Sequence, residues 1–135
     1  MNNRDIQYFE IIGEYCDDVS RTLKRFGQDF STFVNDYDYY NSVLMGIFQI
    51  GEIVNKLSDS AREELDCEIE SHKIIAVRNR IAHAYDDLDK HVIWNIAAEN
   101  LPSLKLFCEK KVEENSHLLS AIDYSLIEDF QDKSY

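Results

Sequence analysis

The amino-acid sequence predicts an all-α protein, an up-and-down four-helix bundle with short additional helices. One proline and four glycines occur in 135 residues, so the residues that interrupt helices are scarce. Hydrophobic residues make up 44% of the chain, which excludes the composition of disordered proteins, and they recur at helical intervals. This length suits a single core, so we expect one helical domain over residues 1–119 and an acidic C-terminal extension over residues 120–135.

The first helix is expected over residues 4–26, where apolar side chains recur every three or four positions. Gly27 follows at the position where a glycine commonly ends a helix. A linker containing Asp29, Ser31 and Asn35 comes next. The apolar stripe of this first helix consists of Ile6, Phe9, Ile12, Gly13, Cys16, Val19, Leu23 and Phe26.

The second helix is expected over residues 36–57, and Ser58 to Ser60 then end it and can cap a short helix over residues 61–66. Its first residues, 36–40, alternate tyrosine with aspartate. We interpret them as a helix start with Tyr40 in the core and the other tyrosines at a protein interface; a platform for stacking RNA bases is the alternative. The apolar face consists of Tyr40, Val43, Leu44, Ile47, Phe48, Ile50, Gly51, Val54 and Leu57.

A third main helix is expected over residues 71–84 and a fourth from Lys90 to about Leu119. Between them lies a loop whose Asp89 can cap the fourth helix. Pro102 must either begin a new helical segment or kink a continuous one, because it has no backbone N–H to donate. Four residues should face the core here, with Trp94 partly shielding them: Val92, Ile93, Ile96 and Ala97.

The chemically richest segment lies within the third helix. Arg78, Asn79 and His83 place a permanent cation, an amide and an imidazole within six residues. Asn79 and His83 are four residues apart and share a helix face. Arg78 and His83 are five residues apart, roughly 140° around the helix. Arg78 can therefore reach around Asn79 or meet His83 of a second subunit. An arginine and a histidine at this spacing alone would more commonly be structural residues.

These side chains suit the cleavage of RNA without a metal. Attack by the 2′-hydroxyl needs one group to take its proton and another to protonate the leaving 5′-oxygen. One imidazole cannot readily do both, whereas two copies facing each other across a two-fold axis can. We therefore expect a symmetric dimer with a composite site. His83 would act as general base or acid, Arg78 would bind the scissile phosphate, and Asn79 would orient the phosphate or the imidazole. The histidines lack the spacing of a zinc site.

The pattern R-N-x-x-x-H-x-Y from Arg78 to Tyr85 resembles the motif of HEPN-superfamily proteins in their HepT-like branch. The resemblance covers about residues 4–115. Two details depart from the family pattern: Ala84 replaces a common glycine, and Ser71-His72 stands where a Pro-Trp pair is usual. These departures concern local loop geometry more than chemistry. Other landmarks occur in the family's order: Gly51-Glu52, Leu57-Ser58, Tyr85-Asp86-Asp87, Ile93-Trp94 and Asn100-Leu101-Pro102-Ser103-Leu104-Lys105.

The resemblance implies a metal-independent ribonuclease toxin of a toxin–antitoxin pair. Its antitoxin would be a minimal nucleotidyltransferase that attaches AMP to the motif tyrosine, here Tyr85. The added phosphodiester would bring negative charge close to Arg78 and so silence the site. No other cofactor is implied. Glu52 and Arg80 are candidate accessory residues; Glu52 either points at the motif helix or is a solvated carboxylate.

Charge is the main objection to an RNA substrate, because the net charge is −12 and most nucleic-acid binders are basic. Residues 1–71 carry 15 acids and 6 bases, a net −9, and residues 109–135 carry 7 acids and 3 bases, a net −4. Residues 72–108 carry 4 acids and 5 bases, a net +1, together with three of the four histidines. The motif therefore lies in the least acidic part, and we expect weak, salt-sensitive RNA affinity.

The remaining features favour a cytoplasmic protein that does not contact membranes. No apolar run approaches the ~20 residues of a membrane span, and the N-terminus lacks the apolar region of a signal peptide. Three cysteines without metal-ligand spacing are expected to be reduced thiols. Two functions stay open. The first is the ribonuclease toxin, and the second is a non-catalytic HEPN module that docks a nucleotidyltransferase and presents nucleotide or a substrate tyrosine to it.

Overall fold

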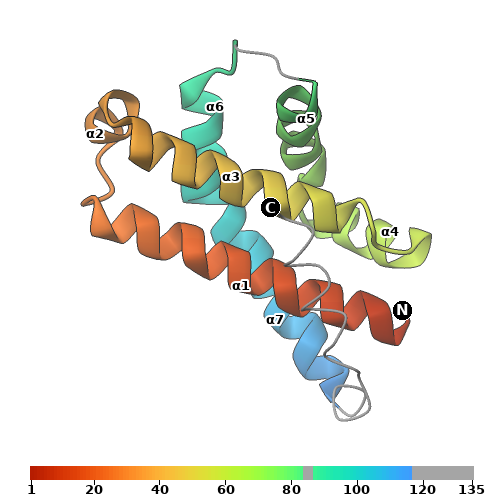
Figure 1. Cartoon of the computed structure of the whole chain (residues 1–135). Helices are drawn as coiled ribbons and strands as arrows, with labels where there is room; N and C mark the ends of the chain where they lie inside the picture. The colour runs from red at the N-terminus through yellow and green to blue at the C-terminus, as the bar shows by residue number, and fades with distance from the viewer. Residues whose placement is uncertain (84–86, 117–135) are drawn as a thin grey trace.

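The computed structural model describes residues 1–83 and 87–116, and all regular structure in these ranges is helical (Figure 1). This confirms the all-α class. The expected boundary at residue 119 and the C-terminal extension lie outside the described residues. The elements in chain order are α1 (Asn3–Arg25), α2 (Phe30–Asn35), α3 (Tyr37–Val54), α4 (Asp59–Glu68), α5 (Ser71–Ala82), α6 (Lys90–Asn95), the π-helical segment η1 (Ile96–Asn100) and α7 (Leu101–Glu114).

Helices α1, α3 and α7 form the centre of the bundle, because α1 packs against both of the others. Helix α5 packs on α3, on the other side of α3 from α1 (Figure 1). The core is apolar and almost free of solvent; its largest fully buried side chains are Tyr39, Phe9, Phe33, Ile6, Ile11, Ile12, Ile47, Ile50, Ile53, Leu65, Ile74 and Ile93. Tyr39, and not Tyr40 as the sequence suggested, is the fully buried tyrosine at the start of α3; Tyr40 is only partly buried. No helix in the described ranges is long and apolar enough to cross a membrane.

A buried carboxylate joins the start of α1 to the turn before α4. Asp5 and Asn2 form a capping box, in which the backbone N–H of each is bonded by the side chain of the other. The Asp5 carboxylate also accepts hydrogen bonds from the backbone N–H and the hydroxyl of Ser58, at 2.9 and 2.6 Å. Ser58 in turn caps α4. The start of α4, the helix that precedes α5, is thereby held against the first turn of α1.

The expected linker after the first helix contains a short helix, α2, which is a correction to the sequence interpretation. Asp29 caps it by accepting hydrogen bonds from the backbone N–H and the hydroxyl of Thr32, at 2.9 and 2.7 Å. Phe33 is fully buried, and its ring centroid lies 5.2 Å from that of Trp94. A helix this short shows no apolar periodicity in the sequence, and tertiary packing of its aromatic rings stabilises it.

The structure decides between the two alternatives for Pro102. Helices α6 and α7 are joined by η1 without an intervening loop, so Pro102 lies within one continuous helical run. A proline at this position cannot donate to the carbonyl four residues earlier, that of Ala98. The wider π turn directly before Pro102 absorbs this interruption. Trp94 is half-buried against the aromatic side chains of the core, as expected. Val92, expected to face the core, is instead 44% exposed.

Candidate active site

The motif helix α5 has a buried face and an exposed face. Its buried face packs on α3 and consists of Ser71, Ile74 and Val77. The helix carries three cationic side chains and no acidic one. The exposed residues of the helix, together with the residue directly after it, are His72, Lys73, Ala76, Asn79, Arg80, Ala82 and His83. The motif helix is therefore cationic in a strongly acidic chain.

Arg78 leaves α5 on the side that faces α3. Gly51 of α3 makes room for it, because a Cβ on this glycine would lie 2.6 Å from the Arg78 Cβ and 3.5 Å from the Ile74 carbonyl oxygen. The next residue, Glu52, accepts a hydrogen bond from the Arg78 Nε and forms an ion pair with it. Both side chains are about 30% exposed, at 28% for Arg78 and 30% for Glu52. Glu52 therefore contacts the motif helix and is not a freely solvated carboxylate.

Asn79 holds the other side of the same guanidinium. Its Oδ1 accepts a hydrogen bond from Arg78 Nη1 at 3.1 Å. An arginine has five N–H donors in one plane, and these two contacts use two of them. Within the described part of the chain the structure gives Arg78 no third hydrogen-bond partner. The guanidinium is thus fixed at two points and still offers donors to a bound phosphate.

His83 lies just beyond the end of α5, not within it as the sequence predicted. Helix α5 ends at Ala82, and His83 is its C-cap residue with φ −98° and ψ 13°. The His83 backbone N–H still donates to the Asn79 carbonyl oxygen at 3.1 Å, so the residue follows the helical register for one more position. Its side chain is exposed. A buried histidine in the core is thereby excluded, and the imidazole is accessible to a substrate.

The two other cations of α5 also face carboxylates from outside the helix. Lys73 Nζ lies 2.7 Å from Glu70 Oε2, and Arg80 Nη1 lies 3.1 Å from Asp87 Oδ1. The three-residue spacing of Glu70 and Lys73 was visible in the sequence as a favourable helical pair. Nothing in the sequence indicated that Arg80 would pair with Asp87, seven residues later. Tyr85, the predicted site of modification, lies outside the described residues.

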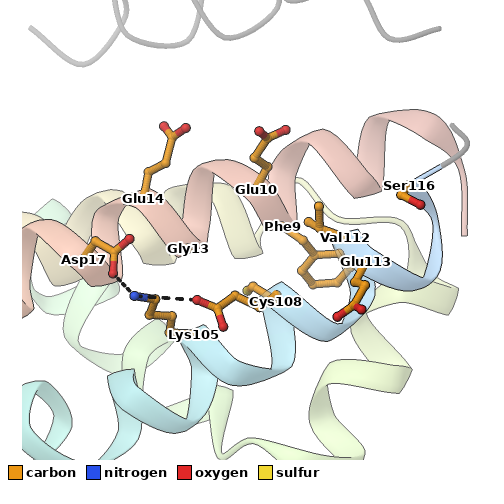
Figure 2. Close-up of a pocket in the computed structure, with 11 residues that line it drawn as sticks. Phe9, Glu10, Gly13, Glu14, Asp17, Lys105, Cys108, Val112, Glu113 and Ser116 are labelled. Atoms are coloured by element: carbon orange, nitrogen blue, oxygen red, sulfur yellow. Dashed lines mark hydrogen bonds and ion pairs between the residues drawn. The ribbon is translucent and has the colours of Figure 1, made fainter. Parts of the chain in front are cut away.

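A cavity of about 350 Å³ between α1 and α7 is a second candidate site (Figure 2). Lys105 is its one basic lining residue in the described chain, and this lysine pairs with Asp17 and Glu109. The pKa of Glu14 is raised by partial burial and by nearby carboxylates. Five acidic side chains line the cavity, namely Glu10, Glu14, Asp17, Glu109 and Glu113. Their charge repels RNA, so the motif helix is the better site for a polyanion.

Other catalytic chemistries find no support in the described residues. Three or more histidine, cysteine, aspartate or glutamate side chains do not gather there in a way that could hold a metal ion. All three cysteines are free thiols, and two of them are buried. Burial raises the pKa of Cys16 to about 12 and raises the pKa of Cys108 as well. These thiols stay protonated near neutral pH and are poor nucleophiles.

A comparison with known protein families covers most of the chain. The family model described as "Ribonuclease HepT-like" matches residues 6–111, which include α5 and all four motif residues from Arg78 to Tyr85. The chain belongs to the HepT-like ribonuclease family. As a HepT-like ribonuclease it is an RNase of the HEPN type. The expectation from the motif is confirmed at this level.

Several relatives of this HepT-like ribonuclease span nearly the same length. Two proteins of Methanocaldococcus jannaschii, named "Putative RNase MJ1216" and "Putative RNase MJ0125", are each 28% identical to it over 115 residues. Those residues are 84% of this chain and 93% and 97% of the two relatives. A protein of Thermococcus cleftensis named "Probable ribonuclease HepT" is 26% identical over 102 residues, 72% of this chain and 92% of the relative. No solved structure matches at a significant level.

Proposed function

We propose that this HepT-like ribonuclease is a metal-independent endonuclease whose active site is shared between two copies of the chain. One observation carries the proposal: α5 presents a guanidinium fixed by Glu52 and Asn79, and an exposed imidazole, His83, follows at the end of the same helix. The first group suits a phosphate and the second suits proton transfer. They are five residues apart, so they point in different directions from one helix.

The reaction assigned to this site is transfer of the phosphate to the neighbouring 2′-oxygen. His83 of one copy takes the proton of the 2′-hydroxyl, and the 2′-oxygen forms a new bond to phosphorus. The bond from phosphorus to the 5′-oxygen breaks, and His83 of the second copy gives that oxygen a proton. The products are a 2′,3′-cyclic phosphate and a free 5′-hydroxyl. Arg78 stabilises the charge that develops on the phosphate oxygens, and Asn79 keeps Arg78 directed at them. Glu52 and Arg80 act as accessory residues.

Cleavage of labelled RNA by the purified protein tests this proposal. His83→Ala should abolish cleavage, because it removes both the acid and the base of a symmetric dimer. His72→Ala is the matched control, since His72 is exposed on the same helix but lies near its other end. Excess EDTA should leave the rate unchanged. Full activity of His83→Ala would overturn the assignment of the catalytic residue, and loss of activity in EDTA would indicate a metal mechanism.

We further propose that the enzyme is a toxin controlled by a nucleotidyltransferase antitoxin. The Tyr85 hydroxyl would attack the α-phosphate of ATP and release pyrophosphate, leaving AMP joined to the tyrosine. Tyr85 is two residues from His83, so the new negative charge would compete with RNA for Arg78. Incubation with the antitoxin and ATP should add AMP-sized mass to the protein and stop cleavage. The Tyr85→Phe variant should remain unmodified and active; modification of this variant would exclude Tyr85 as the acceptor.

A second candidate function is a binding module that docks the nucleotidyltransferase without cutting RNA and presents nucleotide or a substrate tyrosine to it. The net charge of −12 favours this alternative, since it weakens the attraction of RNA to the protein. A stable complex with the nucleotidyltransferase, together with no cleavage by the free protein, would support it. In that case Arg78 and His83 are structural residues.

A further inference from the structure

The outward face of α5 extends well beyond the residues assigned to catalysis. Lys73 and Arg80 are seven residues apart, which is close to two helical turns, so they project from the same side of the helix about 10 Å apart along its axis. His83 follows on the same exposed side, about 80° from Lys73 around the helix at 100° per residue. An extended nucleic-acid strand that enters the active site at His83 can therefore continue along this face toward Lys73.

Each of these two cations is paired with a carboxylate from a segment next to the helix. Lys73 and Glu70 have side chains that are 45% and 60% exposed, and Arg80 and Asp87 have side chains that are 51% and 79% exposed. Exposed ion pairs contribute little free energy, so a competing anion can replace one partner. The Glu52–Arg78 pair differs, because its side chains are only 28–30% exposed. Glu52 therefore positions Arg78, whereas a bound anion can replace Glu70 and Asp87 as the partners of Lys73 and Arg80.

We propose that the outward face of α5 is a binding track for single-stranded RNA, in which backbone phosphates replace Glu70 and Asp87 as the partners of Lys73 and Arg80. The choice of RNA as the ligand rests on the proposed function. Lys73 contacts the strand as a mobile point charge, and Arg80 contacts it through a planar fork of donors. In the free protein the two carboxylates form ion pairs with these cations and so lower the affinity of the protein for RNA. The track thus joins Lys73, which the catalytic assignment leaves unused, to Arg80, an accessory residue of the proposed site.

Binding of a labelled oligouridine to the full-length His83→Ala protein tests the track, since this background excludes cleavage during the measurement. Lys73→Gln should weaken binding about two- to fivefold, as expected for one exposed ionic contact, and lower the slope of log K against log salt by about 0.7. Glu70→Gln should strengthen binding by a similar factor, because it removes the competing carboxylate. If Glu70 had only a structural role, removing its charge would not strengthen RNA binding.

Two control variants separate this local effect from the general effect of charge. Glu109→Gln makes the same change of charge as Glu70→Gln, and Glu109 is also exposed and ion-paired, to Lys105 at 3.6 Å, but on α7. Lys110→Gln makes the same change of charge as Lys73→Gln, at an exposed position on α7. Equal effects of Lys73→Gln and Lys110→Gln, or of Glu70→Gln and Glu109→Gln, would overturn the track.

Two parallel measurements keep this test distinct from that of the proposed function. If the wild-type protein cleaves RNA but substitution of Lys73 or Glu70 leaves RNA binding unchanged, the track is overturned and the proposed ribonuclease function stands. If the wild-type protein does not cleave RNA but the variants change RNA binding as expected, the track is supported and the proposed endonuclease activity is overturned. Sedimentation of each variant reports its oligomeric state. Loss of dimers in Lys73→Gln without altered RNA affinity would assign this face to contact between subunits and overturn the track.

Discussion

The Arg78 guanidinium is fixed by one contact from its own helix and one from α3. Glu52 and Asn79 each accept one of its N–H groups, and they approach from a different helix and from the next residue along the chain. An arginine side chain has many rotamers, so fixing it before the substrate binds removes an entropy cost from the bound state. Glu52 is therefore a positioning residue that acts through Arg78. The same carboxylate also opposes the charge that Arg78 offers to a phosphate.

Substitution of Glu52 should separate these two effects. Glu52→Ala removes the acceptor of the Arg78 Nε, and kcat/KM for RNA cleavage should fall about tenfold, equivalent to about 1.4 kcal/mol. Glu52→Gln keeps a carbonyl oxygen at the same place and should retain most of kcat. Its KM should be lower, because the uncompensated Arg78 binds phosphate more tightly. Single-turnover and steady-state rates measure both values. Wild-type kinetics for Glu52→Ala would show that Arg78 needs no support from α3.

At the scale of helices, the approach of α3 to α5 determines where the site forms. A Cβ on Gly51 would lie 2.6 Å from the Arg78 Cβ, too close for an undistorted contact, so α5 packs closely on α3 at this point. A larger residue would push the helices apart where Arg78 reaches Glu52. Packing and catalysis are thus coupled at one contact between two helices.

Gly51→Ala should lower the free energy of unfolding by about 1–3 kcal/mol, the usual cost of overpacking a core. Gly13→Ala is the matched control, because a Cβ there would lie 3.8 Å from the Cys108 Cβ, an ordinary contact. Alanine also favours the helix over glycine, so Gly13→Ala should be neutral or stabilising. Urea unfolding of the two variants measures the difference. Equal stability of the two variants would contradict the close approach.

The sequence pattern predicted the long helices and the short helix α4, but it missed α2 and the π turn η1. The stripe from Ile6 to Leu23 identified α1 because many turns repeat one pattern. Helix α2 has six residues and shows no such repeat; it depends on the burial of Phe33 among rings distant in the sequence. The π turn before Pro102 likewise reflects an adjustment of the backbone that residue types alone do not specify. Pro102 indicated that the helical hydrogen bonding is interrupted, but it did not indicate that a π turn would accommodate the interruption.

The candidate site shows the same limit at a finer level. The spacing of Arg78, Asn79 and His83 indicated which side chains carry the chemistry and that Arg78 and His83 point in different directions. The partner of Arg78 remained open, because Glu52 is 26 residues away and only the packing of α3 on α5 brings the two together. Arg80 pairs with Asp87, which lies seven residues later and outside α5, so the spacing of residues in the helix does not predict this pair. Contacts within one helix were predictable, and contacts between elements were not.

At the scale of the whole molecule, acidic charge surrounds a cationic helix. The chain has a net charge of −12, yet α5 contains three cations and no acid. The phosphates of RNA are therefore repelled least at α5, and the rest of the chain disfavours their approach. This distribution of charge is compatible with a site for RNA on or next to α5.

Mixed dimers test the shared site directly. When wild-type protein is mixed with an excess of His83→Ala protein, most wild-type chains enter mixed dimers, in which only one of the two chains has His83. If both histidines serve one reaction, cleavage per wild-type chain should decline as these mixed dimers form. An initial-rate assay after subunit exchange measures the decline, and His72→Ala protein added in the same amounts serves as the control. A constant rate per wild-type chain would show that each copy works alone.

The packing of α1 against α7 has a consequence for how the protein is synthesised. Phe9 near the start of the chain meets Phe107 near the end of the described part, with ring centroids 5.5 Å apart. The central core therefore cannot close until the ribosome has released nearly all of the helical domain. Helix α5 emerges earlier, but α3, on which it rests, lacks its packing against a completed core at that time. We expect nascent chains to be inactive, which keeps a ribonuclease from attacking the messenger RNA that encodes it during translation.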